Sequence, residues 1–192
     1  MTAPLRVFLA LNLPAPVRGA IAAATAPMRA AAHQLAWFEE EDLHLTMKFL
    51  GAQPSAAVET LRRALAPALA RIVPVTLDVG GLGAFPDLRA PRVVWMGVAA
   101  DSRLELLHHD IELICAAEGY ELEGRPFRPH ITLGRARDAL AEGPARALRS
   151  AAKMVHHATR VPVDSVEIMA SRLEAGGVRY TALESVALRG GS

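Results

Sequence analysis

The chain has 192 residues, of which 52% are hydrophobic and 21% are charged, and this composition supports a compact core and argues against disorder. A formal net charge of +1 argues against a protein that holds long duplexes through a concentrated basic face, so any contact with nucleic acid should be local. Charges and prolines break the apolar runs well short of the roughly 18 to 20 residues of a membrane span, so we expect no signal peptide and no membrane contact.

The single cysteine, Cys115, lies in an apolar helical pattern and cannot form an internal disulfide. This fits a reducing compartment, so we expect a cytoplasmic protein. No shift in composition and no long linker divides the chain, and we expect one domain over residues 1–192.

The first half of the chain is predicted to alternate strands and helices. Pro14 and Pro16 suit the first turn of an alanine-rich helix that reaches about His33. Apolar residues three or four apart after Pro54 indicate an amphipathic helix that ends near Pro74. Apolar runs of strand length lie at residues 6–13, 35–38, 43–50, 75–82 and 92–98.

The second half repeats this order. Ser102 and Glu105 have the spacing of a capping box and open a helix with one apolar stripe. The elements that follow are a strand at residues 129–135, a helix at 138–155 and closing strands at 161–169 and 178–188. The first closing strand does not alternate, so we expect burial on both of its faces. The expected class is α+β, with two lobes that face each other across a cleft.

Two His-x-Thr motifs carry the clearest chemical signal in the chain. Residues two apart in a strand point to the same side, so His44 and Thr46 should share one face. The same holds for His130 and Thr132. The apolar residues between them anchor the opposite face in the core, which gives the polar face a rigid support. In this alternation Lys48 also falls on the His44 face.

His-x-Thr alone is a weak pattern, and it occurs a third time at His157-Ala158-Thr159. Arg160 follows that copy, which lacks the alternating apolar flank, so we interpret it as a loop before a strand. Apolar residues at the second and fourth positions select the other two copies. If only one motif were present, its histidine would be interpreted as a hydrogen-bonded or partly exposed strand residue without a catalytic role. Two matched copies favour a catalytic pair instead.

Two histidines on rigid strands suit in-line displacement at phosphorus. Their unperturbed pKa lies near neutrality, so one can act as a base and the other as an acid, although spacing alone does not tell which. Threonine hydroxyls on the same face can donate to the phosphate oxygens. Arg125, Arg128 and Arg135 surround the second motif, and Arg135 is the preferred phosphate ligand because it closes the motif strand. Phe49 and Phe127 are candidates either for stacking on a nucleobase or for a place in the core.

At this point the chain resembles the 2H phosphoesterases, and within them the RNA 2′,3′-cyclic phosphodiesterases, also called 2′-5′ RNA ligases. The resemblance covers nearly the whole chain. It rests on the segments Arg6 to Leu11, Leu43 to Gly51, Gly83 to Pro86, Pro91 to Trp95, Phe127 to Arg135, and Ser171 to Leu173 before Tyr180.

The resemblance implies a bilobal fold of two pseudo-symmetric lobes, with antiparallel sheets facing a central cleft and helices outside. It implies hydrolysis of a 2′,3′-cyclic phosphate end to a 2′-phosphate, with no metal ion and no cofactor. His44 would be the proton donor to the 3′ oxygen and His130 the proton acceptor that activates water. Thr46, Thr132 and Arg135 would hold the phosphate. The expected partner is RNA with such an end, tRNA fragments or similar, and the expected state is a monomer.

Other interpretations stay open or are set aside. The same site could join 2′-5′ linkages or open a cyclic phosphate on a small nucleotide, and a catalytically idle RNA-end binding module is a third hypothesis. Gly80 to Pro86 does not fit a dinucleotide loop, because Pro86 stands where the third glycine belongs. His108-His109-Asp110 has no clear partner ligands for a metal, and we expect a solvated helix edge there. Trp37 and Trp95 are expected in the core or in the cleft wall.

Overall fold

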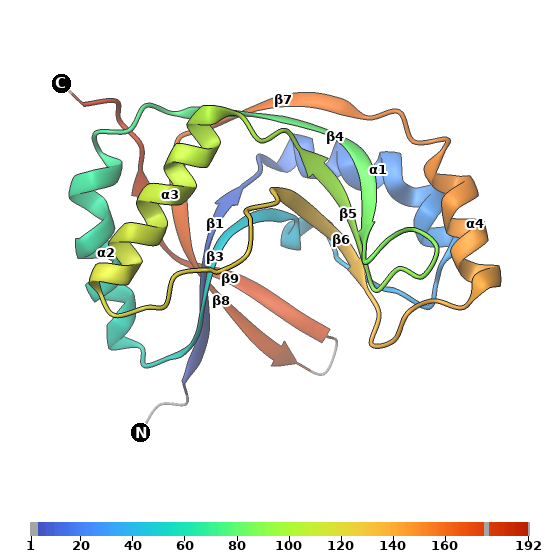
Figure 1. Ribbon diagram of the computed structural model, residues 1–192, viewed down its shortest axis with the longest axis horizontal. Helices are drawn as coiled ribbons and strands as arrows, with labels where there is room; N and C mark the ends of the chain where they lie inside the picture. Colours follow the sequence, from blue (N-terminus) through green and yellow to red (C-terminus); the bar gives the residue numbers. More distant parts are fainter. Residues whose placement is uncertain (1–3, 175–176, 192) are drawn as a thin grey trace.

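The computed structural model describes residues 4–174 and 177–191 and has an α+β fold, as expected from the sequence (Figure 1). The described helices are α1 (Ala15–Ala31), α2 (Ala56–Leu69), α3 (Ser102–Ala117) and α4 (Glu142–Ala152), with a short 3-10 helix, η1 (Glu40–Asp42). The strands are β1 (Leu5–Asn12), β2 (Ala36–Trp37), β3 (His44–Gln53), β4 (Val75–Phe85), β5 (Val93–Val98), β6 (His130–Arg135), β7 (Ala158–Val163), β8 (Ser165–Glu174) and β9 (Gly177–Ala187).

The nine strands of the described residues form one antiparallel sheet, in which two halves meet at the motif strands. The order is β7-β4-β5-β6-β3-β1-β8-β9, and the short β2 also pairs with β6. The resemblance implied an antiparallel sheet in each lobe, and the pairing of β3 with β6 at Leu45 and Ile131 joins the two into one sheet. The two His-x-Thr strands therefore lie side by side in the middle of the molecule.

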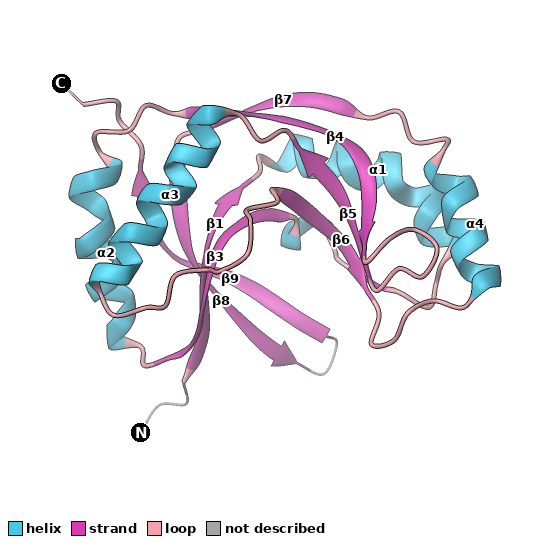
Figure 2. Cartoon of the chain, in the orientation of Figure 1, coloured by secondary structure: helices cyan, strands magenta, loops and turns pink. Residues whose placement is uncertain are grey.

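The helices cover the two ends of the sheet in pairs (Figure 2). Helix α1 packs against α4, while α2 packs against α3 and β9. The main core fills the space between helices and sheet and takes one side of each strand, such as Val7, Leu9 and Leu11 of β1. Phe8 and Ala10 point to the other side. Within the described residues, no helix is long and apolar enough to cross a membrane.

The prediction of a single strand at residues 161–169 is wrong, because this stretch belongs to two strands. The chain ends β7 at Val163 and starts β8 at Ser165, and these strands lie in opposite halves of the sheet. Pro162 fits the first of them because β7 is an edge strand, where its missing N–H leaves no ladder partner unpaired. The expectation of two-sided burial is confirmed for β8, in which Val166 to Ala170 are all buried.

The helix boundaries also differ from the prediction. The Oδ1 of Asp101 accepts a hydrogen bond from the N–H of Leu104 at 2.8 Å, so Asp101 caps α3 and Ser102 is its first residue. The predicted N-cap, Ser102, is therefore one residue too late, and Leu104 at the third helical position does not form a capping box. Helix α2 ends at Leu69 instead of near Pro74, and α4 is shorter than the predicted 138–155.

Candidate active site

The register of β3 and β6 brings the two motifs onto one side of the sheet. Leu45 is opposite Ile131, and both point into the core with less than 2% exposed. In an antiparallel pair the flanking residues then point to the other side. We call this side the histidine face and define it by His44, Thr46, His130 and Thr132.

Each motif histidine is oriented in the same way by the backbone that precedes its strand. The Nδ1 of His44 lies 2.7 Å from the carbonyl oxygen of Asp42, and the Nδ1 of His130 lies 2.6 Å from that of Arg128. A carbonyl oxygen only accepts, so each Nδ1 carries the hydrogen and donates it. In both residues Nε2 is therefore the nitrogen left to act on a substrate.

Aromatic side chains from neighbouring strands flank both imidazoles. The His44 ring lies 5.0 Å from the ring of Phe8 and 5.1 Å from that of Tyr180. The His130 ring lies 5.1 Å from Phe85 and 6.0 Å from Trp95. Of these four aromatic residues, only Trp95 was expected near the site, in the core or in the cleft wall. Phe8, Phe85 and Tyr180 were not predicted as site residues, although all three belong to the segments that carry the family resemblance, and this signal could have identified them.

Burial lowers the pKa of both imidazoles. Burial is the largest cause for His44, whose pKa falls to about 4, and the charge of Arg135 lowers it further against the raising effect of the Asp42 carbonyl. Burial also comes first for His130, again with a contribution from Arg135 in the same direction. Both imidazoles are therefore mainly neutral at pH 7 in the free protein.

A β-bulge in β3 changes which side chains share the histidine face. Ala10 pairs with Thr46 and Leu9 with Lys48, so Met47 has no partner and the alternation reverses after it. The placement of Lys48 beside His44 is therefore wrong, because Lys48 points to the helices and is 5% exposed. Phe49 takes the place on the histidine face, with its ring 6.0 Å from that of Phe8 and 65% of the residue exposed.

A second bulge acts in the same way in β6. Trp95 pairs with Thr132 and Val94 with Gly134, which leaves Leu133 without a partner. Strict alternation would turn Arg135 away from His130, and the bulge returns it to the histidine face. Its guanidinium carbon lies 5.6 Å from the centre of the Phe38 ring.

The other predicted cations contribute differently. The Arg128 side chain is exposed, and it is the carbonyl of this residue that contacts His130. Arg125 is exposed and forms an ion pair with Glu123 at 3.1 Å. Phe127 is half-buried and stacks on His108, with ring centres 3.9 Å apart and an angle of 14° between the planes.

Of the motifs that were set aside, Gly80 to Pro86 contributes Phe85 to the wall beside His130, whereas the other two lie off the histidine face. His157 is in the loop before β7, as predicted, at the edge of the sheet. The expectation of a solvated edge at His108 is wrong, since its side chain is 14% exposed and stacked. Among residues 4–174 and 177–191, no group of three or more His, Cys, Asp or Glu residues is placed to hold a metal ion.

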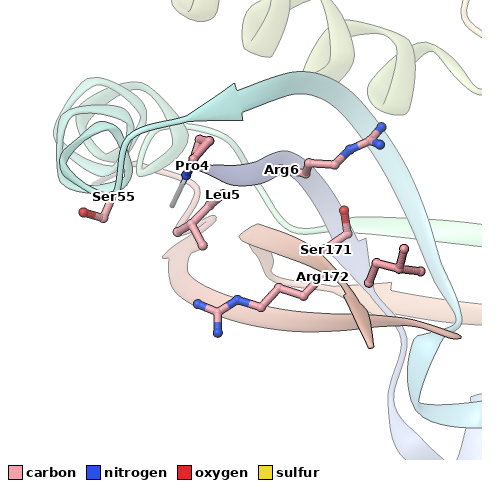
Figure 3. A pocket seen from close by; sticks show the side chains of 7 residues that line it. Pro4, Leu5, Arg6, Ser55, Ser171 and Arg172 are labelled. Carbon is pink, nitrogen blue, oxygen red and sulfur yellow. The ribbon is translucent and has the colours of Figure 1, made fainter. Parts of the chain in front are cut away.

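A hollow of about 600 Å³ lies at one end of β1 and β8 (Figure 3). Figure 3 shows Arg6 and Ser171 on one side of these paired strands and Arg172 on the other. Arg6 lies two residues before Phe8 on β1 and pairs with Ser171, so this end of the histidine face carries a positive charge. The lining residues are Pro4, Leu5, Arg6, Ser55, Ser171, Arg172 and Leu173, and none of them was predicted as a site residue.

Comparison with known proteins gives consistent results in sequence and in structure. The family model of the 2′-5′ RNA ligase superfamily matches residues 14–174. A Geobacillus stearothermophilus protein named RNA 2′,3′-cyclic phosphodiesterase is 40% identical over 114 residues, which cover 59% of this chain but only 36% of that protein. A Thermus thermophilus protein of the same name is 31% identical over 194 residues, which cover 97% of this chain and 91% of the relative.

A solved structure extends the likeness to the fold. The crystal structure of Escherichia coli LigT complexed with 3′-AMP matches with a TM-score of 0.74 at 29% identity, over 96% of this chain and 98% of that chain. The resemblance inferred from the motifs is thus confirmed over most of the chain. The chain belongs to the 2′-5′ RNA ligase superfamily of 2H phosphoesterases.

Proposed function

We propose that this protein hydrolyses RNA 2′,3′-cyclic phosphate ends to 2′-phosphates by acid and base catalysis from two histidines, without a metal ion. The observation that carries the proposal is the matched orientation of His44 and His130, each with Nδ1 bound to a backbone carbonyl and Nε2 left for the substrate. The name shared by the relatives from Geobacillus stearothermophilus and Thermus thermophilus supports the choice of substrate.

The reaction follows from the two Nε2 atoms. His130 accepts a proton from water as the water oxygen forms a bond to phosphorus. The bond from phosphorus to the 3′ oxygen breaks, and the Nε2–H of His44 donates its proton to that oxygen. The products are a 3′ hydroxyl and a 2′-phosphate. After the product leaves, His130 loses its extra proton to solvent, and His44 takes up a proton when the next substrate binds.

The rest of the histidine face supplies contacts for the phosphate. The hydroxyls of Thr46 and Thr132 donate to its non-bridging oxygens, where negative charge increases in the transition state. Arg135 follows on the same face after the bulge in β6 and adds a charged, planar donor. Phe49 offers an exposed ring for the base, and the exposed Arg128 side chain adds a positive charge beside the second motif.

The low pKa of His44 needs a partner if this residue is the acid. Raising it from about 4 to about 7 corresponds to about 4 kcal/mol. One negative charge at about 4 Å supplies about that much at an effective dielectric constant of 20. The anionic cyclic phosphate therefore charges His44 by binding next to it, so that the acid forms in the complex with substrate.

Reversal of the same chemistry would join 2′-5′ linkages, and a small cyclic nucleotide would fit the same catalytic groups. The exposed Phe49 and the positive charge of Arg6 favour an oligonucleotide, because both lie on the histidine face beyond the reacting phosphate. Comparing an oligonucleotide with a mononucleotide distinguishes these alternatives.

The direct test is turnover of an RNA oligonucleotide that ends in a 2′,3′-cyclic phosphate, with the product identified by 31P NMR. We expect a 2′-phosphate and the same rate with and without EDTA. A 3′-phosphate product, or loss of activity in EDTA, would contradict the scheme. Absence of turnover with oligonucleotide and mononucleotide alike would leave the idle binding module as the better hypothesis.

A further inference from the structure

A buried ion pair lies on the helix side of β3, where the bulge places Lys48. The Nζ of Lys48 donates to both carboxylate oxygens of Glu112 on α3, at 2.9 and 2.8 Å. Only 4% of the Lys48 side chain and 8% of the Glu112 side chain are exposed. The proposed reaction uses neither residue.

Both members of the pair also bind the backbone of the segment that leads to His130. Lys48 Nζ donates to the carbonyl oxygen of Glu121 at 2.8 Å, and Glu112 Oε2 accepts from the N–H of Glu123 at 3.0 Å. The segment 118–129 contains no helix and no strand, so few backbone contacts of its own hold it in place. The ion pair therefore anchors it from the core.

His108 extends this anchor toward the second motif. It lies one turn before Glu112 on α3, with Nε2 3.9 Å from Glu112 Oε1. Its ring is stacked on Phe127 at 3.9 Å. Phe127 directly precedes Arg128, and the Arg128 carbonyl accepts the Nδ1–H of His130 at 2.6 Å.

A buried ion pair is weak support for stability, since apolar residues of similar size often replace one without loss. Its hydrogen bonds do, however, define one position for the backbone that they reach. We propose that Lys48, Glu112 and His108, here called the buried polar cluster, are positioning residues. They hold residues 121–128 so that the Arg128 carbonyl keeps the hydrogen of His130 on Nδ1 and leaves Nε2 as the base.

This inference rests on the proposed function for its kinetic consequence, because it assigns His130 as the base. It also links the two motifs, since Lys48 belongs to the strand of His44 and anchors the segment that orients His130. A misplacement of about 1 Å in a catalytic group can reduce the rate by about 100-fold. Loss of the anchor should thus reduce kcat by about 10- to 100-fold, with KM changed less than about 3-fold.

The test uses a paired variant, because removing one partner would leave a buried charge without a counter-ion. Lys48→Met with Glu112→Leu removes both charges and keeps similar volumes. His109→Ala on the same helix is the matched control, since His109 is exposed. We expect the paired variant to fold, by circular dichroism, with kcat reduced as above, and the control to retain its kcat.

The stacked ring gives a second, milder comparison. His108→Phe keeps a flat ring against Phe127, while His108→Ala removes it. We expect His108→Phe to retain most of the kcat and His108→Ala to lose about 10-fold or more. If the paired variant fails to fold, the difference in kcat between His108→Phe and His108→Ala tests the proposal in its place. Equal kcat in these two variants would overturn the proposal.

A readout independent of activity is the tautomer of His130, measured from the 15N shifts of its imidazole. We expect hydrogen on Nδ1 in the unmodified protein and a mixture of tautomers in the paired variant. An unchanged tautomer together with an unchanged kcat overturns the proposal. A changed tautomer in a protein that turns over no cyclic phosphate supports the positioning role and contradicts the proposed function instead.

Discussion

Phe49 and Arg135 occupy matching places, each five residues after its motif histidine and each turned onto the histidine face by a β-bulge. The two motif strands thus carry the same histidine and threonine and differ at the fifth residue after the histidine. One strand ends the face with an exposed aromatic ring, and the other ends it with a cation. We infer that this difference sets the direction in which the RNA end binds across the two similar histidines. The base of the RNA lies toward Phe49 and the phosphate lies toward Arg135.

Replacing Phe49 with alanine should weaken binding more than catalysis. Stacking on an aromatic ring contributes about 1 to 3 kcal/mol for each base, so KM for an oligonucleotide should rise about 5- to 100-fold while kcat stays within about 3-fold. Phe49→Tyr keeps a ring and should retain the original KM. Steady-state kinetics of both variants check this, and a normal KM for Phe49→Ala would exclude stacking at this position.

Replacing Arg135 with alanine should have two measurable effects. Loss of a charged hydrogen bond of about 1.5 to 3 kcal/mol should lower kcat/KM about 10- to 100-fold. The pKa of His44 and that of His130 should both rise, since the Arg135 charge lowers both. NMR titration of the two imidazoles tests the second effect. Arg135→Lys should keep the low pKa values and restore only part of kcat/KM, and unchanged pKa values in Arg135→Ala would contradict the placement of the charge.

The pH dependence of kcat/KM should reflect the low pKa values of the free histidines. Both limbs of the profile should lie below 6.5, because burial lowers both pKa values and that of His44 to about 4. Activity at low substrate should therefore fall as pH rises through the higher of these two pKa values, and so already below pH 6.5. The kcat profile should be shifted to higher pH, because the bound phosphate favours the charged imidazole. Rates from pH 4 to 9 measure both profiles, and a kcat/KM limb above pH 7 in the free enzyme would count against this account.

Gly83 is expected to be essential for the wall beside His130. A Cβ added there would overlap the indole ring of Trp95, so Gly83→Ala must displace that ring. We expect a less stable protein with reduced kcat, measured by urea unfolding and steady-state kinetics. Trp95→Phe removes the overlapping atoms, so the double variant should be more stable than Gly83→Ala alone. Equal stability of the two would contradict this steric explanation.

The sequence predicted the α+β class, most strands and helices, and the two histidine motifs, because these depend on local patterns. It could not predict the bulges, which depend on pairing with another strand. Strict alternation therefore placed Lys48 on the histidine face, whereas the bulge puts Phe49 there. Arg135 was predicted as the phosphate ligand because it is the last residue of its strand. It reaches the histidine face only because of a bulge that the sequence did not predict.

The sequence also did not predict contacts between distant parts of the chain. Tyr180 reaches His44 because β9 pairs with β8, which pairs with β1, and the local pattern of apolar and polar residues around Tyr180 does not indicate this. The division of residues 161–169 has the same cause. A single residue separates Val163 from Ser165, and only their partner strands place them in opposite halves of the sheet.

The most direct test of the two-histidine mechanism is the rate of cyclic phosphate opening in three single variants. His44→Ala and His130→Ala should each lose at least about 100-fold in kcat, the lower bound for a catalytic acid or base. His157→Ala is the matched control, since it carries the third His-x-Thr copy at the sheet edge, and it should retain the original kcat. Full activity in His44→Ala or in His130→Ala would contradict the mechanism.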